Sequence, residues 1–342
     1  MLFANGVKKE YHMDMKPILI GCPFDNGIRS MLRFERGITG ADAGPKAVFS
    51  AFKKEFSKKY PQVKTRMLPL SEYNLEVTHE NICDLAFRKA QKDATVKAQD
   101  FMTAKIKEVC ERGFLPISIG GDHSVTYPLC RGLCRANPDK KVGVIYMDAH
   151  FDMRDFDKDE EVGGVISSGN AFRRLIEDKN LNVRGENVVV IGIHNTGSEM
   201  YLSLENYAKS KNVTIVYDHE VKNIGDTVRK ALEVAGNGTD LIYFSVDIDG
   251  VNQKYVPGVS APAETGLTDL QLYDLVRGIA KDERVHAFDI AETSSRELAW
   301  TEIIKGEKRN ETKTERAKKL KATAGIVAKT IDSFLSARNN HE

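Results

Sequence analysis

The sequence predicts an α/β protein of three layers (α/β/α), in which a central, mostly parallel sheet lies between two layers of helices. Two observations predict this class: short, continuous apolar runs recur along the chain, and stretches with helical patterns lie between them. Such runs are typical of strands buried on both faces, and their alternation with helices is typical of a parallel sheet. A third observation is that no linker rich in Pro, Gly or Ser divides the chain. We therefore expect one domain over residues 1–342.

Seven segments have the composition of buried strands, with apolar and β-branched residues in short runs. In chain order they are PILIGCPF (17–24), FLPISIGG (114–121), KVGVIYMDA (141–149), NVVVIGIH (187–194), VTIVYD (213–218), DLIYFSVDID (240–249) and VHAFDIAE (285–292). Helical patterns lie between these strands, for example at residues 84–113, 227–236 and 267–282, and a last helix is expected at 325–338. The polar segment 305–319 is expected to form a solvated loop or the beginning of the last helix.

Charge and composition exclude several classes of partner. The 50 Lys and Arg residues nearly balance the 49 Asp and Glu residues, and the resulting net charge of +1 argues against a nucleic-acid-binding protein. There is no run of about 18 apolar residues, so we expect no membrane-spanning helix. The N-terminus lacks the apolar segment of a secretion signal. The five cysteines form no CxxC pair, which fits a reducing compartment. We expect a cytoplasmic protein that acts on a small molecule.

Acidic residues and histidines follow three of the expected strands. The first of these strands leads into GGDHS (120–124), the second into DAHFD (148–152), and the third ends in SVDID (245–249). In a parallel sheet the ligand site lies outside the carboxyl ends of the strands. Residues at two-residue spacing share one face of a strand, so we expect the acids and histidines of each motif to converge there.

Buried acids at such a site need cations, because like charges repel in a medium of low dielectric constant. Four Asp residues carry four negative charges, which two divalent cations would cancel. Two imidazoles together with four carboxylates suit Mn²⁺, with Zn²⁺, Co²⁺ or Fe²⁺ as alternatives. Two metals that share a water lower its pKa and supply hydroxide near neutral pH. An isolated Asp-X-Asp is commonly a turn, but three motifs at three strand ends predict metal-assisted hydrolysis.

The motifs GGDHS, DAHFD and SVDID resemble, in the same order, the three metal motifs of the ureohydrolases, the family of arginases, agmatinases and formimidoylglutamases. The resemblance implies an arginase-like fold, two Mn²⁺ ions, and a homo-trimer or homo-hexamer. It also implies six metal ligands, namely His123, Asp148, His150, Asp152, Asp247 and Asp249.

The segments around the motifs are most similar to those of formimidoylglutamases. Arginases and agmatinases typically carry a His in the loop where this chain has Ser168, within ISSGNAFRR (166–174). DAHFDMR (148–154) and VPGVSAP (256–262) also resemble the formimidoylglutamase branch. This resemblance implies hydrolysis of N-formimidoyl-L-glutamate to L-glutamate and formamide, a reaction of histidine degradation.

The resemblance also implies roles for residues around the metals. Asp152 would carry a proton to the leaving amine, and Glu292 would pair with the cationic formimidoyl group. The substrate's glutamate end would meet Ser168, Asn170 and Arg173. Arg154 and Arg29 are further candidates for its carboxylates, although each could equally be a surface arginine. His194 and Asn195 are expected to border the pocket, with His194 as a structural residue.

The sequence departs from the family pattern at two places, and it leaves alternatives open. Asn252-Gln253 stand where Asp-Pro is usual, and Thr293-Ser294 follow Glu292 where Val-Asn-Pro is usual. One alternative is a ureohydrolase that releases urea from a guanidino compound (an agmatinase, guanidinobutyrase or arginase). A second is a two-metal phosphoesterase. A third is a ureohydrolase-like protein without catalysis that binds or regulates a partner.

Overall fold

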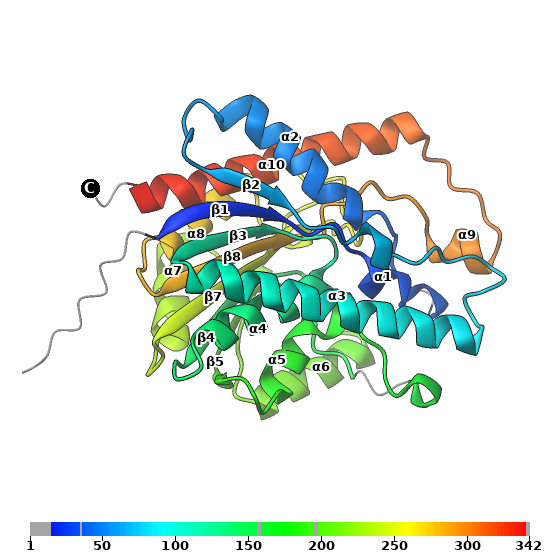
Figure 1. Cartoon of the computed structure of the whole chain (residues 1–342), viewed down its shortest axis with the longest axis horizontal. Helices are drawn as coiled ribbons and strands as arrows, with labels where there is room; N and C mark the ends of the chain where they lie inside the picture. The colour runs from blue at the N-terminus through cyan, green and yellow to red at the C-terminus, as the bar shows by residue number, and fades with distance from the viewer. Residues whose placement is uncertain (1–14, 35, 156–158, 195–196, 340–342) are drawn as a thin grey trace, which may run out of the picture.

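A single sheet of eight parallel strands organises the chain (Figure 1). The computed structural model describes residues 15–34, 36–155, 159–194 and 197–339. The strand order across the sheet is β2-β1-β3-β8-β7-β4-β5-β6. The strands are β1 (Lys16–Gly21), β2 (Lys64–Met67), β3 (Phe114–Ile119), β4 (Val142–Met147), β5 (Val183–Ile193), β6 (Thr214–Tyr217), β7 (Leu241–Asp247) and β8 (Val285–Ala291). The predicted three-layer α/β class is therefore confirmed, while the extension of one domain over all 342 residues stays a prediction.

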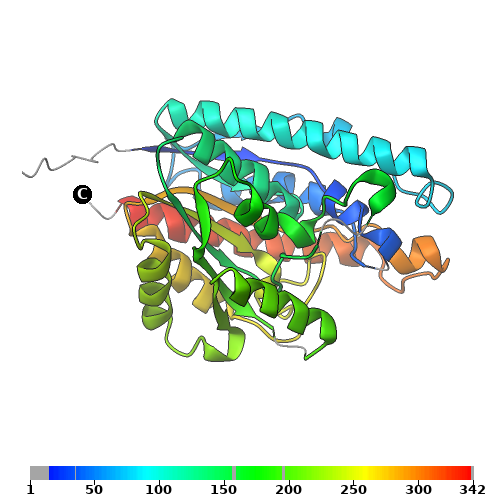
Figure 2. The same ribbon diagram turned by 90° about the horizontal axis from the view of Figure 1, so that it is seen from below.

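Helices cover both faces of this sheet, as the two perpendicular views show (Figures 1 and 2). Hydrophobic contacts place α2, α7, α8 and α10 on one face and α3, α4, α5 and α6 on the other. The helices are α1 (Asn26–Arg29), α2 (Gly44–Phe56), α3 (Leu85–Glu111), α4 (Thr126–Ala136), α5 (Ala171–Glu177), α6 (Glu199–Ser210), α7 (Ile224–Ala235), α8 (Asp269–Ala280), α9 (Trp300–Ile304) and α10 (Lys313–Asn339). Among the described residues, no helix combines the length and the apolar character needed to cross a membrane.

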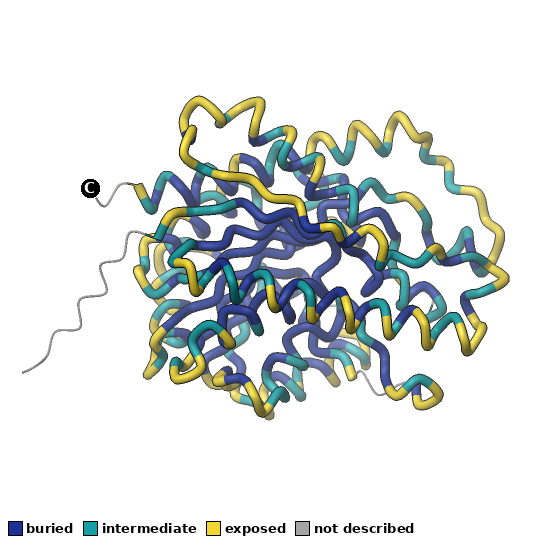
Figure 3. The backbone as a smooth tube through the Cα atoms, in the orientation of Figure 1, coloured by how far each residue is buried: buried dark blue, intermediate teal, exposed yellow. Residues whose placement is uncertain are grey.

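Each central strand contributes side chains to the hydrophobic cores on both faces of the sheet. On β4, Ile145 and Met147 pack in the core below one layer, whereas Val144 and Tyr146 pack in the core below the other. Successive strand residues point to opposite faces, so a strand buried on both faces is apolar at most positions and not only at alternate ones. The central strands are accordingly buried throughout, and exposure is concentrated on the outer helices and on β2 (Figure 3).

Two elements differ from the expectation. The strand β2 was not expected, because its sequence KTRM has no apolar run and all four residues are exposed. It pairs only with β1 at the edge of the sheet, where backbone hydrogen bonds rather than buried side chains hold it. The last helix begins at Lys313, before its apolar pattern at 325–338 and within segment 305–319, for which a helix start was one of the two expectations; its first turns are largely exposed.

Candidate metal centre and active site

The six residues of the predicted metal site lie together at the carboxyl ends of central strands. His123 begins a 3-10 turn shortly after β3, and Asp247 is the last residue of β7. The β4 motif follows Met147, and Asp249 lies in a 3-10 turn over residues 248–250. Strand β8, which lies between β3 and β7, ends immediately before Glu292. Four neighbouring strands therefore deliver side chains to one place.

The expectation that strand alternation brings these side chains together is wrong in its detail. Asp148, His150 and Asp152 lie in a loop after β4, and Asp152 has a left-handed backbone with φ of 45°. Asp148 Oδ1 accepts a hydrogen bond from the backbone N–H of His150 at 2.6 Å, and Asp247 Oδ1 accepts one from Asp249 N–H at 2.9 Å. The carboxylates of Asp148 and Asp247 thus each stabilise a turn in the backbone that follows them. These turns, rather than the alternation of side chains along a strand, bring the ligand side chains together.

Three carboxylates surround one nitrogen of His123. Its Nδ1 lies 3.0 Å from an oxygen of Asp152 and 3.2 Å from oxygens of both Asp148 and Asp247. One N–H cannot donate well to three acceptors. Ligands about 2.0–2.2 Å from one cation are separated by roughly 3 Å when they stand at right angles. The distances from His123 Nδ1 to the three carboxylates are therefore those expected between ligands of one metal ion, and all four ligand atoms lie within 4.8 Å of one another.

A second group adjoins the first and shares Asp148 with it. The Nδ1 atom of His150 lies 3.4 Å from Asp148 Oδ1 and 3.4 Å from Asp249 Oδ2, and these three residues could hold one ion. The four acid side chains and His123 are at most 9% exposed, whereas the side chain of His150 is 30% exposed. The second group is thus the one nearer to solvent.

The electrostatics of the cluster call for added positive charge. Burial, together with Asp249 and Asp148, raises the pKa of Asp247 well above its usual range. Burial alone would lower the pKa of His123, but hydrogen bonds to Asp148, Asp152 and Asp247 outweigh it and raise the pKa well above the usual range. Asp249 Oδ1 is buried and has no hydrogen-bond partner among the described residues. This donor set of carboxylate and imidazole groups fits two divalent cations that share Asp148.

A buried network behind His123 fixes its ring. The other ring nitrogen, Nε2, lies 3.0 Å from Ser245 Oγ, and that hydroxyl donates to Asp289 Oδ1 at 2.9 Å. Asp289 also accepts hydrogen bonds from Tyr243 and Thr126. Partners of this kind set the tautomer and orientation of a metal-ligating imidazole. The sequence reasoning missed them, although Ser245 lies two residues before Asp247 and Asp289 is an acid inside an apolar strand.

Glu292 is held by a backbone hydrogen bond through one carboxylate oxygen, while its other oxygen makes none of good geometry with the described residues. Its Oε1 accepts the backbone N–H of His123 at 2.7 Å, whereas its Oε2 is buried without a hydrogen-bond partner in the described part of the chain. The residue is 3% exposed and has a φ of 68°, a conformation that L-amino acids seldom adopt. Burial and the neighbouring Asp122 raise its pKa well above the usual range, while the nearby hydroxyl of Ser260 acts in the opposite direction. A buried carboxylate oxygen beside the cluster is thus available to a ligand.

The structure gives three of the predicted substrate residues other partners. Asn170 accepts from Ser167 N–H and donates to Val165 O, so its amide stabilises its own loop. Arg173 lies 3.2 Å from Glu177 and stacks on a tyrosine ring. Arg29 pairs with Asp25 at 2.5 Å. Ser168, half-buried in the same loop, keeps its place as a candidate.

Arg154 differs from these residues because its guanidinium makes no hydrogen bond or ion pair with any residue that the structure describes. A Cβ added at Gly169 would lie 3.0 Å from Arg154 Cδ and 3.2 Å from its Cζ, so the side chain packs along this loop. Burial and the neighbouring Arg36 lower the pKa of Arg154, while Asp152 and Asp148 act in the opposite direction. Arg154 therefore lies within electrostatic reach of both a second arginine and the acid cluster.

Two further sequence features have structural roles. Asn252, where Asp is usual, accepts from Lys254 N–H at 2.9 Å and donates to Glu264 O, which closes the loop outside the metal groups. His194 lies 3.5 Å from Thr265 Oγ1 and 3.7 Å from Asp218, and it belongs to neither metal group. Asn195 lies outside the described residues.

Comparison with known proteins identifies the family. The model of the arginase family matches residues 15–297, and the chain therefore belongs to the arginase family. The formimidoylglutamase of Staphylococcus epidermidis is 28% identical over 275 residues, which are 80% of this chain and 77% of that protein. The guanidinobutyrase of Pseudomonas aeruginosa is 28% identical over 201 residues, 58% of this chain and 59% of that protein.

Solved structures share the fold. The formimidoylglutamase of Bacillus subtilis superposes with a TM-score of 0.66 at 22% identity, covering 94% of this chain and 88% of that chain. The formiminoglutamase of Trypanosoma cruzi, solved with Mn²⁺, gives a TM-score of 0.63 at 22% identity, covering 94% of this chain and 96% of that chain. The resemblance to the ureohydrolases and the arginase-like fold are thereby confirmed.

Proposed function

We propose that this protein is a two-metal hydrolase that cleaves N-formimidoyl-L-glutamate to L-glutamate and formamide. The observation that carries the proposal is the pair of ligand groups sharing Asp148, with a free Glu292 oxygen and an unpaired Arg154 beside them. The similarity to the formimidoylglutamase of Staphylococcus epidermidis supports this substrate, and so does Ser168 in the place of the usual His.

The residues that would hold the two cations are the six of the sequence motifs. His123, Asp152 and Asp247 would complete one site with Asp148, and His150 and Asp249 the other. Mn²⁺ is the first candidate, because a structure with this fold was solved with Mn²⁺ and the donors suit that ion. When bound, such a pair lowers the pKa of a water and supplies a hydroxide nucleophile near neutral pH.

Glu292 and Asp152 would act on the substrate directly. The free Oε2 of Glu292 would accept a hydrogen bond from the cationic formimidoyl nitrogen, and this charge-assisted bond would orient and polarise the C–N group. Asp152 would carry a proton to the leaving amine of glutamate. The burial of both carboxylates excludes water and strengthens each interaction.

Arg154 would recognise a carboxylate of the substrate. Its guanidinium presents several N–H donors in a planar fork that matches a carboxylate, and no protein carboxylate in the described residues occupies it. Arg36 adds positive charge on the outer side. Ser168 could add a hydrogen bond from the adjoining loop. Substrate binding by Asn170 and Arg173 stays a prediction, since both side chains already have partners within the protein.

The test is an assay of the metal-loaded protein against separate substrates. The protein is incubated with Mn²⁺ and then with N-formimidoyl-L-glutamate, 4-guanidinobutyrate, agmatine or L-arginine, and formamide and urea are measured. We expect formamide from the first compound and little urea from the others. Urea from a guanidino compound without formamide from the first would refute the proposed substrate. Bound metal with no product at all would favour a binding or regulatory protein.

One alternative substrate has an observation in its favour. A guanidinobutyrase from Pseudomonas aeruginosa is among the relatives, and 4-guanidinobutyrate also carries a carboxylate that Arg154 could bind. Agmatine carries a cationic amine in place of that carboxylate, and the positive charges of Arg154 and Arg36 would repel it.

A cytoplasmic location and a trimeric or hexameric assembly stay predictions. Light scattering coupled to size-exclusion chromatography measures the assembly.

A further inference from the structure

The loop that follows Glu292 has an unfavourable backbone. Both Glu292 (φ 68°) and Arg296 (φ 55°) adopt left-handed conformations without being glycine. Such residues persist only where the surrounding structure holds them. The segment 293–298 must therefore be restrained by its contacts, and those contacts come from two sides.

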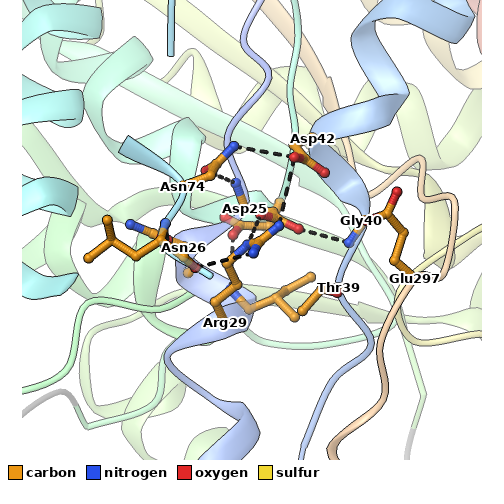
Figure 4. Close-up of polar contacts among 12 residues, drawn as sticks. Asp25, Asn26, Arg29, Thr39, Gly40, Asp42, Asn74 and Glu297 are labelled. Carbon is orange, nitrogen blue, oxygen red and sulfur yellow. Dashed lines mark hydrogen bonds and ion pairs between the residues drawn. The ribbon is translucent and has the colours of Figure 1, made fainter. Parts of the chain in front are cut away.

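One side is the segment around residues 39–40. Thr39 is bonded to two successive residues of the loop, because Glu297 N–H donates to Thr39 O at 2.8 Å and Thr39 N–H donates to Leu298 O at 2.9 Å. Ser295 N–H donates to Gly40 O at 3.0 Å, and Gly40 N–H donates to a carboxylate oxygen of Asp25 at 2.8 Å. Asp25 is the centre of the polar network in Figure 4. The first restraint thus runs from Asp25 to the loop.

The other side is formed by two arginines of the C-terminal region, Arg309 and Arg316, which we call the arginine clamp. Arg309 Nη1 donates to Arg296 O at 2.8 Å, and its Nη2 donates to Glu297 O. Arg316 Nη1 donates to the same two carbonyls, at 3.0 and 2.7 Å. Two carbonyl groups thereby receive four hydrogen bonds from three guanidinium nitrogens.

Two acidic residues, Glu302 and Glu311, form ion pairs with the basic side chains in and around the clamp. Glu302 lies 2.5 Å from Arg309, and Glu311 lies 3.4 Å from Arg296 and 2.6 Å from Lys319. Arg296 Nη1 also donates to Val259 O at 2.8 Å. The clamp is therefore a connected ionic network between α9, α10 and the loop after β8, not a pair of solvated side chains.

We propose that the arginine clamp positions Glu292. The link from the clamp to that residue is the short backbone segment 292–296, which is fixed along its length: Arg296 N–H donates to Ser294 Oγ at 2.9 Å, and Ser294 N–H donates to Gly258 O at 2.8 Å. Glu292 N–H in turn donates to Gly121 O at 2.8 Å. At the far end Glu292 Oε1 accepts His123 N–H. The clamp residues lie beyond 297, where the match to the arginase family model ends. The proposal rests on the proposed function for the role of Glu292, but its structural part can be measured without a substrate.

The test compares Arg316→Ala with Lys321→Ala, a change at an exposed residue of the same helix, in the full-length metal-loaded protein. Residue-resolved hydrogen exchange is measured at the amides of Ser295, Glu297 and His123. Arg316→Ala should accelerate exchange at all three, whereas Lys321→Ala should leave them unchanged. The His123 amide is decisive, because its hydrogen bond reports the Glu292 carboxylate. Metal content should not change.

Kinetics then test whether the clamp acts through Glu292. A displaced reacting group costs up to roughly a hundredfold in rate, so we expect Arg316→Ala to lower kcat/KM by roughly tenfold and Arg316→Lys to restore part of it. In a Glu292→Gln background the additional loss should be less than about twofold, because residues that act as a unit are not additive.

Each result decides the proposal. Unchanged exchange at His123 in Arg316→Ala, or a full additional tenfold loss in the Glu292→Gln background, would overturn it. If Arg316→Ala does not fold, Arg309→Gln and Arg316→Lys remove single donors and permit the same comparison. If the wild-type protein hydrolyses none of the four compounds, the proposed function fails, and the exchange at His123 alone still decides whether the clamp positions Glu292.

Discussion

At the scale of single residues, Asp148 connects the two ligand groups. One of its oxygens lies 3.2 Å from His123 Nδ1, and the other lies 3.4 Å from His150 Nδ1. Among the described residues only Asp148 belongs to both groups. It is also wholly buried, so its charge has no solvent to stabilise it. A change at this position should therefore affect both cations together.

The first prediction concerns this residue. Asp148→Asn keeps the shape of the side chain but removes its charge, so both sites should lose affinity by more than the roughly 10–100-fold that is typical of changes outside the ligand shell. Metal content by atomic spectroscopy and turnover should fall together. Asp274→Asn, an exposed change on α8, is the matched control. Full metal content with normal turnover in Asp148→Asn would contradict the proposed ligand set.

The second prediction separates two arginines. Arg154 has no protein partner among the described residues, whereas Arg173 is paired with Glu177. We therefore expect Arg154→Leu to raise the KM for N-formimidoyl-L-glutamate by roughly 10-fold or more, in line with about 1.5–3 kcal/mol for a hydrogen bond to a charged group. Arg173→Leu should change KM little. Steady-state kinetics of both variants check this, and the reverse ranking would restore the sequence-based choice of Arg173.

At the scale of elements, strands β7 and β8 carry buried polar side chains that orient His123 of the metal site. Tyr243 and Ser245 on β7 and Asp289 on β8 form one buried hydrogen-bonded set that reaches His123. A polar network inside an apolar sheet is stable only if all its members are satisfied. The sheet therefore aligns the imidazole before any metal binds.

The third prediction concerns this network. Asp289→Ala leaves the hydroxyls of Tyr243 and Ser245 without their acceptor, which should lower the free energy of unfolding by about 1–3 kcal/mol. Because His123 is then less well oriented, metal affinity should also fall by roughly 10–100-fold. Urea denaturation and metal titration measure the two effects. Asp289→Asn, which keeps an acceptor oxygen, should lose less of both, and an equal loss would argue against orientation by hydrogen bonding.

At the scale of the whole molecule, the metal centre couples binding to stability. Central strands of the sheet end in carboxylates whose repulsion is offset only partly by two imidazoles. Cations that bind the folded chain and not the unfolded chain must raise the free energy of unfolding. The centre is thus expected to stabilise the fold as well as to carry the chemistry.

The fourth prediction follows from that coupling. At a free metal concentration 100 times Kd, one such ion should add about 2.7 kcal/mol to the free energy of unfolding. Removal of metal with a chelator should therefore lower Tm by several degrees, and added Mn²⁺ should restore it. Differential scanning calorimetry measures this. Asp148→Asn should show little response, and an equal response in that variant would place the stabilising ion elsewhere.

The fold class was predictable because the central strands β3, β4, β7 and β8 are buried on both faces almost throughout, and burial favours an apolar sequence. The strand β2 could not be predicted, since an edge strand with exposed side chains is held by backbone hydrogen bonds that leave no pattern. The start of α10 was left open between a loop and a helix start in segment 305–319, because its first turns are solvent-exposed and polar and carry no apolar pattern.

The sequence by itself determined the fold class and the set of six candidate ligands, because each motif is contiguous and follows an apolar strand. Only the tertiary structure decided that Asp148 is shared, that Arg154 rather than Arg173 is unpaired, and that Glu292 has one free oxygen. These properties depend on contacts between distant parts of the chain, such as Glu292 with His123, which are 169 residues apart. Such contacts cannot be predicted from the local sequence, since the role of a carboxylate or a guanidinium depends on the groups that distant segments of the folded chain place next to it.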